Sequence, residues 1–286
     1  MAAMTSTTCI TTGAGSFTAD VAGPEDGPTV LLLHGFPQSR HTWRDALPAL
    51  AGAGFRAVAP DQRGYSPGVR PTDLDAYATD RLVGDVIDLL DVLGVERVHL
   101  VGHDWGGQVA WLTAVHHPDR LATLTVLSRP HPAAFARSFG LDAEQAARSG
   151  HHRSIGPETT DRWWADGCAT LRNVLARAGV PAADADAYLA VFDERAALDG
   201  ALMWYRAAAR TGGLRAADCP AVDVPTLYLW GTADQSVGRV AAELTVEHVT
   251  GEYRFVEIDG GGHFLTDDGA ATVVVDELVA HVTAHR

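Results

Sequence analysis

The chain has 286 residues and a formal net charge of −14, from 22 basic and 36 acidic side chains. An acidic chain without a basic run is not expected to bind nucleic acid or an anionic membrane surface. All 22 basic residues are arginines, so no lysine is present for a Schiff base or for a P-loop. Hydrophobic residues make up 47% of the chain, which is typical of a globular protein.

The cysteines and the apolar segments indicate the compartment. Cys9, Cys168 and Cys219 are odd in number and widely spaced, which favours neither a disulfide framework nor a metal site. The first fifteen residues lack the basic and apolar regions of a secretory signal. No apolar run approaches the roughly 20 residues of a membrane helix. We therefore expect a cytoplasmic protein that holds no metal and does not bind a membrane.

Short apolar runs alternate with longer amphipathic segments along the chain. The runs predict strands at 30–33, 57–59, 98–101, 124–127, 227–230 and 255–258. The segments predict helices over 42–52, 76–93, 106–116 and 270–285. Continuous apolar runs are typical of parallel strands that are covered on both faces. The expected fold class is therefore α/β, with a mostly parallel, doubly wound sheet.

The alternation stops after residue 127 and resumes near Pro225. The sequence between these points has a helical pattern and is rich in Ala and Arg. We interpret 130–215 as a helical cap, or lid, inserted into a core formed by 1–129 and 216–286. Because ligands of open α/β sheets bind beyond the carboxyl ends of the strands, this cap is expected to cover the site.

The strongest motif is G-H-D-W-G-G at 102–107, between the strand at 98–101 and the helix that follows. In this context, glycines that flank a central residue indicate a nucleophile elbow, and the nucleophile here is Asp104. A carboxylate that attacks an sp³ carbon leaves an ester, which water can hydrolyse, whereas a serine would leave an ether. Asp104 therefore favours epoxide opening or halide displacement over ester or amide hydrolysis.

His263 lies in a glycine-rich loop after the strand at 255–258, where a general base for water is expected. Asp234 follows the strand at 227–230 and is the preferred carboxylate to orient this histidine. The other place for the acid, after the strand at 124–127, carries Ser128-Arg129-Pro130 and has no carboxylate. Asp259 is a weaker rival, which we interpret as a turn residue.

The loop His34-Gly35-Phe36-Pro37 follows the strand at 30–33. Its place predicts that the Phe36 N–H is one donor of an oxyanion hole and that the Trp105 N–H is the second. We expect His34 and Pro37 to contribute to the substrate-binding site.

Together these motifs resemble the α/β-hydrolase-fold epoxide hydrolases, which are close to the haloalkane dehalogenases. The resemblance covers nearly the whole chain and also rests on the segments 61–66 and 204–206. It implies the α/β-hydrolase fold with the cap after the sixth strand, and no cofactor. It also implies an ester on Asp104 that is hydrolysed by water activated by His263, which Asp234 orients. Tyr205 matches the cap tyrosine that donates to the epoxide oxygen.

The chain departs from this family near the start of the cap, where a second tyrosine is usual. Residues 148–152 carry histidines at this place. The second donor is expected to be His151, or the indole N–H of Trp163 or Trp164. The adjacent tryptophans also indicate an aromatic-lined pocket.

The expected function is hydrolysis of an apolar or aromatic epoxide, such as a natural-product intermediate, to a vicinal diol. The small-molecule substrate would be bound by a monomer or a homodimer. A haloalkane dehalogenase with the same triad is the first alternative; it needs two N–H donors for the halide, and Tyr205 favours the epoxide instead. A non-catalytic binding protein of this fold is the second alternative, and the complete set of Asp104, Asp234 and His263 argues against it.

Overall fold

The computed structural model describes residues 4–150, 154–211, 217–267 and 269–286. Its centre is one sheet with the strand order β1-β2-β4-β3-β5-β6-β7-β8. The strands from β4 to β8 in this order run parallel, and β1 and β2 form an antiparallel edge. The strands are β1 (Ser6–Thr12), β2 (Gly15–Ala22), β3 (Thr29–Leu33), β4 (Arg56–Pro60), β5 (Val98–His103), β6 (Leu121–Leu127), β7 (Thr226–Gly231) and β8 (Tyr253–Ile258). The α/β class and the mostly parallel sheet are therefore confirmed.

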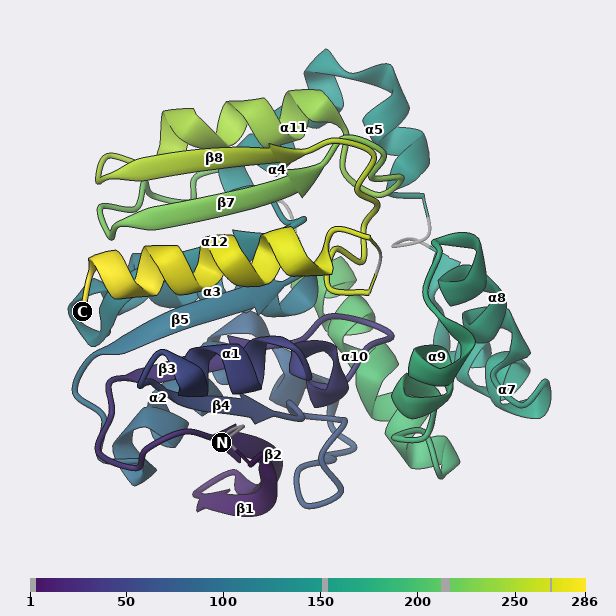
Figure 1. Cartoon of the computed structure of the whole chain (residues 1–286). Coiled ribbons are helices and arrows are strands. Elements are labelled where there is room, and N and C mark those ends of the chain that lie inside the picture. The colour runs from purple at the N-terminus through teal and green to yellow at the C-terminus, as the bar shows by residue number, and fades with distance from the viewer. Residues whose placement is uncertain (1–3, 151–153, 212–216, 268) are drawn as a thin grey trace.

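Helices cover both faces of the sheet (Figure 1). One face carries α1 (Ala46–Gly52) and α12 (Ala271–Ala284), and the other carries α2 (Thr79–Val92), α3 (Trp105–His116) and α11 (Arg239–Leu244). Each face buries its own apolar cluster, and successive residues of β3 join opposite clusters. Because both faces of the parallel strands are buried, the sequences of these strands are continuous apolar runs.

The predicted helices are present, with two of them divided. The segment at 42–52 forms the 3₁₀ helix η1 (Arg40–Trp43) and then α1, and the segment at 76–93 forms η2 (Leu74–Tyr77) and then α2. Ala78 separates the second pair because its backbone is extended, with a ψ of 147°. The remaining 3₁₀ helices are η3 (Pro118–Arg120) and η4 (Thr245–His248).

The N-terminal hairpin of β1 and β2 is not among the strands predicted from the sequence. In β1 only Ile10 is buried, and the neighbouring threonines face solvent. Threonine favours strands because it is β-branched, but a single buried position gives no alternating apolar pattern. The edge position of β1 therefore hides this strand from hydrophobic periodicity, whereas β2 carries a short alternating pattern, with Phe17 and Ala19 buried, that was not recognised as a strand.

The helical insertion after β6 is confirmed. Its helices are α4 (Pro132–Leu141), α5 (Ala143–Arg148), α7 (Pro157–Ala165), α8 (Ala169–Arg177), α9 (Ala182–Leu189) and α10 (Arg195–Thr211). The helices from α7 to α10 form a group beyond the carboxyl ends of the strands, whereas α4 packs against α11 and η4 of the core (Figure 1). The domain boundaries at 129/130 and 215/216 stay a prediction, and residues 215 and 216 lie outside the described residues.

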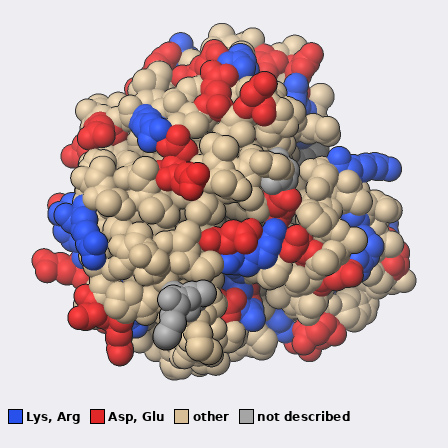
Figure 2. Space-filling model, in the orientation of Figure 1, with Lys and Arg blue, Asp and Glu red and all other residues tan. Residues whose placement is uncertain are grey.

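The charges on the surface are mixed. On the face shown in Figure 2, acidic and arginine side chains of the described residues are interspersed and do not gather into a basic patch. Within the described ranges, no helix combines the length and the apolar character that crossing a membrane requires.

Among the buried histidines are His99, His103, His131 and His281. Burial lowers the pKa of each to about 4, because the charged imidazolium loses its hydration there. These side chains are therefore neutral in the folded protein at neutral pH.

We expect the free energy of unfolding to fall as the pH decreases from about 6.5 to about 4. In this interval the unfolded chain binds protons on these histidines and the folded chain does not, so protonation favours unfolding. Urea unfolding at several pH values, followed by tryptophan fluorescence, measures this effect. A His99→Asn variant, which lacks one of the four groups, should show a shallower decline. An unfolding free energy that is constant over the interval would contradict the expectation.

Candidate active site

Asp104 lies at the sharp turn between β5 and α3, with a φ of 50° and a ψ of −114°. A positive φ is strained for a residue with a side chain and persists only where the surroundings enforce it. Here α3 lies so close to β3 that a Cβ on Gly106 would approach the Leu33 carbonyl oxygen to 2.2 Å. The turn therefore holds the carboxylate at the carboxyl end of the central strand.

The loop after β3 approaches this carboxylate directly. A Cβ on Gly35 would lie 2.5 Å from the Asp104 Cβ, so the close approach requires glycine. The Phe36 N–H donates a hydrogen bond to Asp104 Oδ1 at 3.0 Å. Trp105 is the first residue of α3, so its N–H has no partner within the helix. The structure brings Phe36 to the nucleophile as expected, and donation by the Trp105 N–H stays a prediction.

His263 lies between two carboxylates. Its Nε2 is 3.6 Å from Asp104 Oδ2, and its Nδ1 is 2.9 Å from Asp234 Oδ2. Asp234 is held in turn by the backbone N–H groups of Ser236 and Val237, which donate to its Oδ1 at 2.7 and 2.9 Å. This geometry turns Nε2 of the imidazole toward the nucleophile.

The alternative acids do not reach the histidine. Asp259 is exposed and accepts a hydrogen bond from Thr232 Oγ1 at 3.3 Å, as a turn residue does. After β6, the buried Arg129 occupies the other acid position and donates to Gln108 Oε1 from Nε and Nη2. Burial lowers the pKa of Arg129 to about 10, against the charge of Asp104, so this group is a cation close to the site.

The charges of the three catalytic candidates are coupled. Burial by itself would lower the pKa of His263, but the two carboxylates, Asp234 foremost, raise it to about 10. Burial would raise the pKa of Asp104, but His263 and the Phe36 N–H hold it well below its usual range. In the resting protein at neutral pH, an imidazolium therefore faces two carboxylates.

Tyr205 of α10 lies over the nucleophile from the cap side. Its side chain is 4% exposed, and its ring is edge-on to Trp105 at 5.0 Å and to Phe36 at 5.4 Å. Burial raises the pKa of Tyr205 well above its usual value, and the negative charge of Asp104 adds to this effect. The phenol thus stays protonated beside the carboxylate.

The other cap residues differ in their positions. The Trp163 ring stacks near Phe36 at 6.3 Å, whereas Trp164 is 36% exposed on the surface of α7. His151 lies outside the described residues. Phe192, which the sequence analysis missed, lies 6.4 Å from Phe36; no motif surrounds it, and only its place in a cap could have indicated it. The rings at 36, 163, 192 and 205 form an aromatic side of the site.

His34 holds the loop of residues 34–37, which we call the oxyanion loop, through hydrogen bonds of its ring to the backbone. Its ring is fully buried, with Nδ1 2.9 Å from the Gly35 carbonyl oxygen, and its Nε2 accepts from the Gln62 N–H at 3.1 Å. Both ring nitrogens are thus engaged with the backbone, and contact of His34 with substrate stays a prediction. Pro37 is buried and follows Phe36 through a cis peptide bond, and its contact with substrate stays a prediction.

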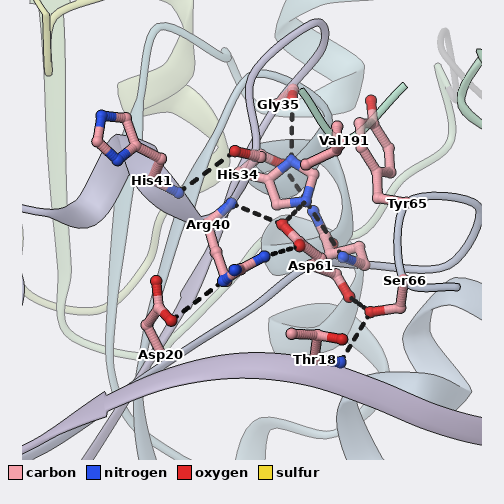
Figure 3. A network of polar contacts seen from close by, with 12 residues as sticks. Thr18, Asp20, His34, Gly35, Arg40, His41, Asp61, Tyr65, Ser66 and Val191 are labelled. Atoms are coloured by element: carbon pink, nitrogen blue, oxygen red, sulfur yellow. Dashed lines mark hydrogen bonds and ion pairs between the residues drawn. The ribbon is translucent and has the colours of Figure 1, made fainter. Parts of the chain in front are cut away.

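The motif at 61–66 holds the same loop from another side (Figure 3). The Arg40 N–H donates to Asp61 Oδ1 at 2.9 Å, and the Arg40 guanidinium pairs with both Asp61 and Asp20. Ser66 Oγ donates to the Asp61 carbonyl oxygen at 2.6 Å. The polar residues of this motif therefore position the loop that carries Phe36.

Comparison with known proteins adds independent evidence. Residues 28–146 match the family model described as alpha/beta hydrolase fold. The chain is 36% identical to epoxide hydrolase A of Mycobacterium tuberculosis, over 90% of this chain and 92% of the relative. It is 33% identical to epoxide hydrolase 4 of Mus musculus, over 86% and 71%. The crystal structure of epoxide hydrolase A from Mycobacterium thermoresistibile superimposes with a TM-score of 0.84 at 29% identity, covering 98% of each chain.

A His263→Gln variant should remove a pH-dependent part of the stability. Because the pKa of His263 is raised from 6.5 to about 10, its stabilisation is fully present below pH 6.5 and is lost as the pH rises toward 10. The difference in unfolding free energy between the native protein and the variant should therefore shrink over this interval. Paired urea titrations at several pH values measure the difference, and a constant difference would show that the pKa is not raised.

Proposed function

Because this chain belongs to the α/β-hydrolase-fold epoxide hydrolases, we propose that it opens an apolar or aromatic epoxide to a vicinal diol through an ester on Asp104. The observation that carries the proposal is the position of this carboxylate. One oxygen accepts the Phe36 N–H, and the other faces His263. A nucleophile, an N–H donor for one of its oxygens and a base beside the other are thus grouped at one carboxylate.

In the first step, Asp104 Oδ2 attacks an epoxide carbon. Oδ1 is held by the Phe36 N–H at 3.0 Å, so it becomes the carbonyl oxygen of the ester. The low pKa of Asp104 keeps the carboxylate ionised and able to attack. The bond that breaks is the epoxide C–O bond, and the epoxide oxygen leaves as an alkoxide on the same molecule.

Tyr205 supplies a proton to that alkoxide. An alkoxide is far more basic than a phenolate, so proton transfer from a phenol is favourable even when burial raises the phenol pKa. Halide departure needs no proton. The buried phenol beside Asp104 therefore favours an epoxide over the haloalkane alternative.

Formation of the ester changes the state of His263. In the resting protein the charge of Asp104 helps to raise the pKa of the imidazole. An ester has no charge, so alkylation removes this contribution and the imidazolium releases its proton more readily. That proton passes, by way of water, to the Tyr205 phenolate that the first step leaves, which restores the phenol. The neutral imidazole can then act as general base. The first step in this way prepares the base for the second.

In the second step, water loses a proton to His263 and attacks the Asp104 acyl carbon. The negative charge that develops on Oδ1 lies at the Phe36 N–H and at the N-terminus of α3, where it is stabilised. Collapse of this intermediate expels the ester oxygen as an alkoxide, which takes the proton of the newly formed carboxyl group. The diol then leaves, the Asp104 carboxylate is restored, and His263 keeps the proton taken from water. Asp234 keeps Nε2 turned toward the water through the contact with Nδ1.

The aromatic side of the site indicates the substrate class. The rings of Phe36, Trp163, Phe192 and Tyr205 would contact an apolar substrate, and aromatic lining is typical of pockets for such ligands. As the second hydrogen-bond donor we propose Trp163, whose ring lies beside Phe36, rather than Trp164, which is 36% exposed.

A His263→Gln variant should form the ester but fail to hydrolyse it. After reaction with a good epoxide such as a styrene oxide, intact-protein mass spectrometry should show an adduct equal to the mass of the whole epoxide. An Asp104→Ala variant should show neither adduct nor turnover, because the nucleophile is absent. Diol formation by Asp104→Ala, or no adduct on His263→Gln, would contradict the ester mechanism.

A Tyr205→Phe variant should slow ester formation from an epoxide by about 10²-fold, the range typical for loss of a general acid. The matched control is Tyr253→Phe, which removes a buried phenolic oxygen that has no hydrogen-bond partner among the described residues and belongs to β8. Single-turnover kinetics measure the rate constant of ester formation for both variants. If Tyr205→Phe alkylates at the native rate, the assignment is wrong and dehalogenation becomes the function to test.

A further inference from the structure

A buried polar cluster joins the loop that carries His263 to the oxyanion loop and to the cap. Its centre is the Asp267 carboxylate, whose side chain is fully buried. None of the steps described above uses these residues. We name it the Asp267 cluster, and its members are Gln38, Thr42, Arg44, Asp184, Tyr188, Thr266 and Asp267.

Three donors from two parts of the molecule converge on Asp267. Gln38 Nε2 donates to Oδ2 at 2.6 Å and Arg44 Nη1 donates to Oδ1 at 2.8 Å, both from the segment between β3 and α1. The Tyr188 hydroxyl donates to Oδ1 from α9 of the cap. A buried carboxylate is tolerated only when it is paired and hydrogen-bonded, so these donors determine where it can lie.

Asp267 is also close in sequence to the general base. Its N–H donates to the Phe264 carbonyl oxygen at 2.9 Å, which closes a tight turn directly after His263. Thr266 in the same turn bonds Thr42 Oγ1 at 2.5 Å. Because Gln38 is two residues from Phe36, the cluster connects the turn beside the base with the loop of the oxyanion donor.

The cap reaches the cluster through one helix. Asp184 of α9 accepts from Arg44 Nη2 at 3.1 Å and lies 2.9 Å from His41 Nε2. Tyr188, one turn later on α9, adds the hydrogen bond to Asp267. The same face of α9 therefore contacts both the Arg44 guanidinium and the Asp267 carboxylate of the core.

On this basis, and resting on the proposed function, we propose that Asp267 and Tyr188 are positioning residues for His263. Asp267 fixes the turn that follows His263. Because Tyr188 bonds to Asp267 from α9, the position of this turn depends on how α9 packs against the core. Hydrolysis of the ester is then fastest when the cap is seated on the core.

The two chemical steps depend on this cluster to different degrees. Ester formation needs Asp104, the Phe36 N–H and Tyr205, none of which lies in the turn after His263. Ester hydrolysis needs His263 Nε2 at hydrogen-bond distance from a water that faces the Asp104 acyl carbon. The loop that carries Phe36 is also held by the contacts of His34 and Asp61, which lie outside the cluster. Displacement of the turn therefore slows the second step and leaves the first nearly unchanged.

The test is a Tyr188→Phe variant, which removes one hydroxyl and leaves the Arg44–Asp267 pair. Its matched control is Tyr77→Phe, which removes another buried phenolic hydrogen bond, to the Pro71 carbonyl oxygen, close to α10 of the cap. Rapid-quench mass spectrometry with a styrene oxide gives the rate constants of ester formation and ester decay separately. Rate constants do not depend on the folded fraction, so a partly unfolded variant remains informative.

We expect Tyr188→Phe to slow ester decay about tenfold, as a small displacement of a reacting group can, with ester formation within about twofold of the native rate. The ester should accumulate in the steady state, and Tyr77→Phe should behave as the native protein does. Unchanged ester decay, or equal slowing of both steps, would overturn the proposal. Absence of any ester in the native protein and in His263→Gln would instead show that the proposed function is wrong.

Discussion

The strained turn at Asp104 is the constraint on which the rest of the active site depends. Asp104 is held there at a φ of 50°. The close packing of α3 against β3 enforces this backbone conformation, and this packing is possible because Gly106 has no side chain. The turn directs one carboxylate to three separate segments: the loop after β3, the loop after β8 and the cap helix α10. Each segment then needs its own support, and the buried polar networks around Asp61 and Asp267 provide it.

The same position determines the electrostatics. Two carboxylates flank His263 and hold it as an imidazolium in the resting protein, so the ion pairs keep the nucleophile ionised. In the proposed mechanism, loss of the charge on Asp104 is the event that releases the base. The order of the two steps is thus a consequence of one change in charge, and no separate movement is required.

Much of this arrangement could be predicted from the sequence, because it is encoded by local patterns. The elbow at 102–107, the histidine loop and Asp234 each follow an apolar run, and parallel strands bring their carboxyl ends together. The outer strand of the N-terminal hairpin, β1, could not be predicted in this way because it buries only Ile10. The hydrogen bonds that tie His34 to the backbone of the loop could not be predicted either, because they depend on the folded position of Gln62. Phe192 and Tyr188 have no motif, and only tertiary packing shows their partners.

The most direct test of this account is the origin of the oxygen in the diol. A single turnover in ¹⁸O-labelled water, with enzyme in excess over a styrene oxide, separates attack by Asp104 from direct attack by water. The account predicts an unlabelled diol from the first turnover, because its new oxygen comes from Asp104 Oδ2, and it predicts ¹⁸O in the Asp104 carboxylate by peptide mass spectrometry. Label in the diol of a single turnover, with none in Asp104, would contradict the account.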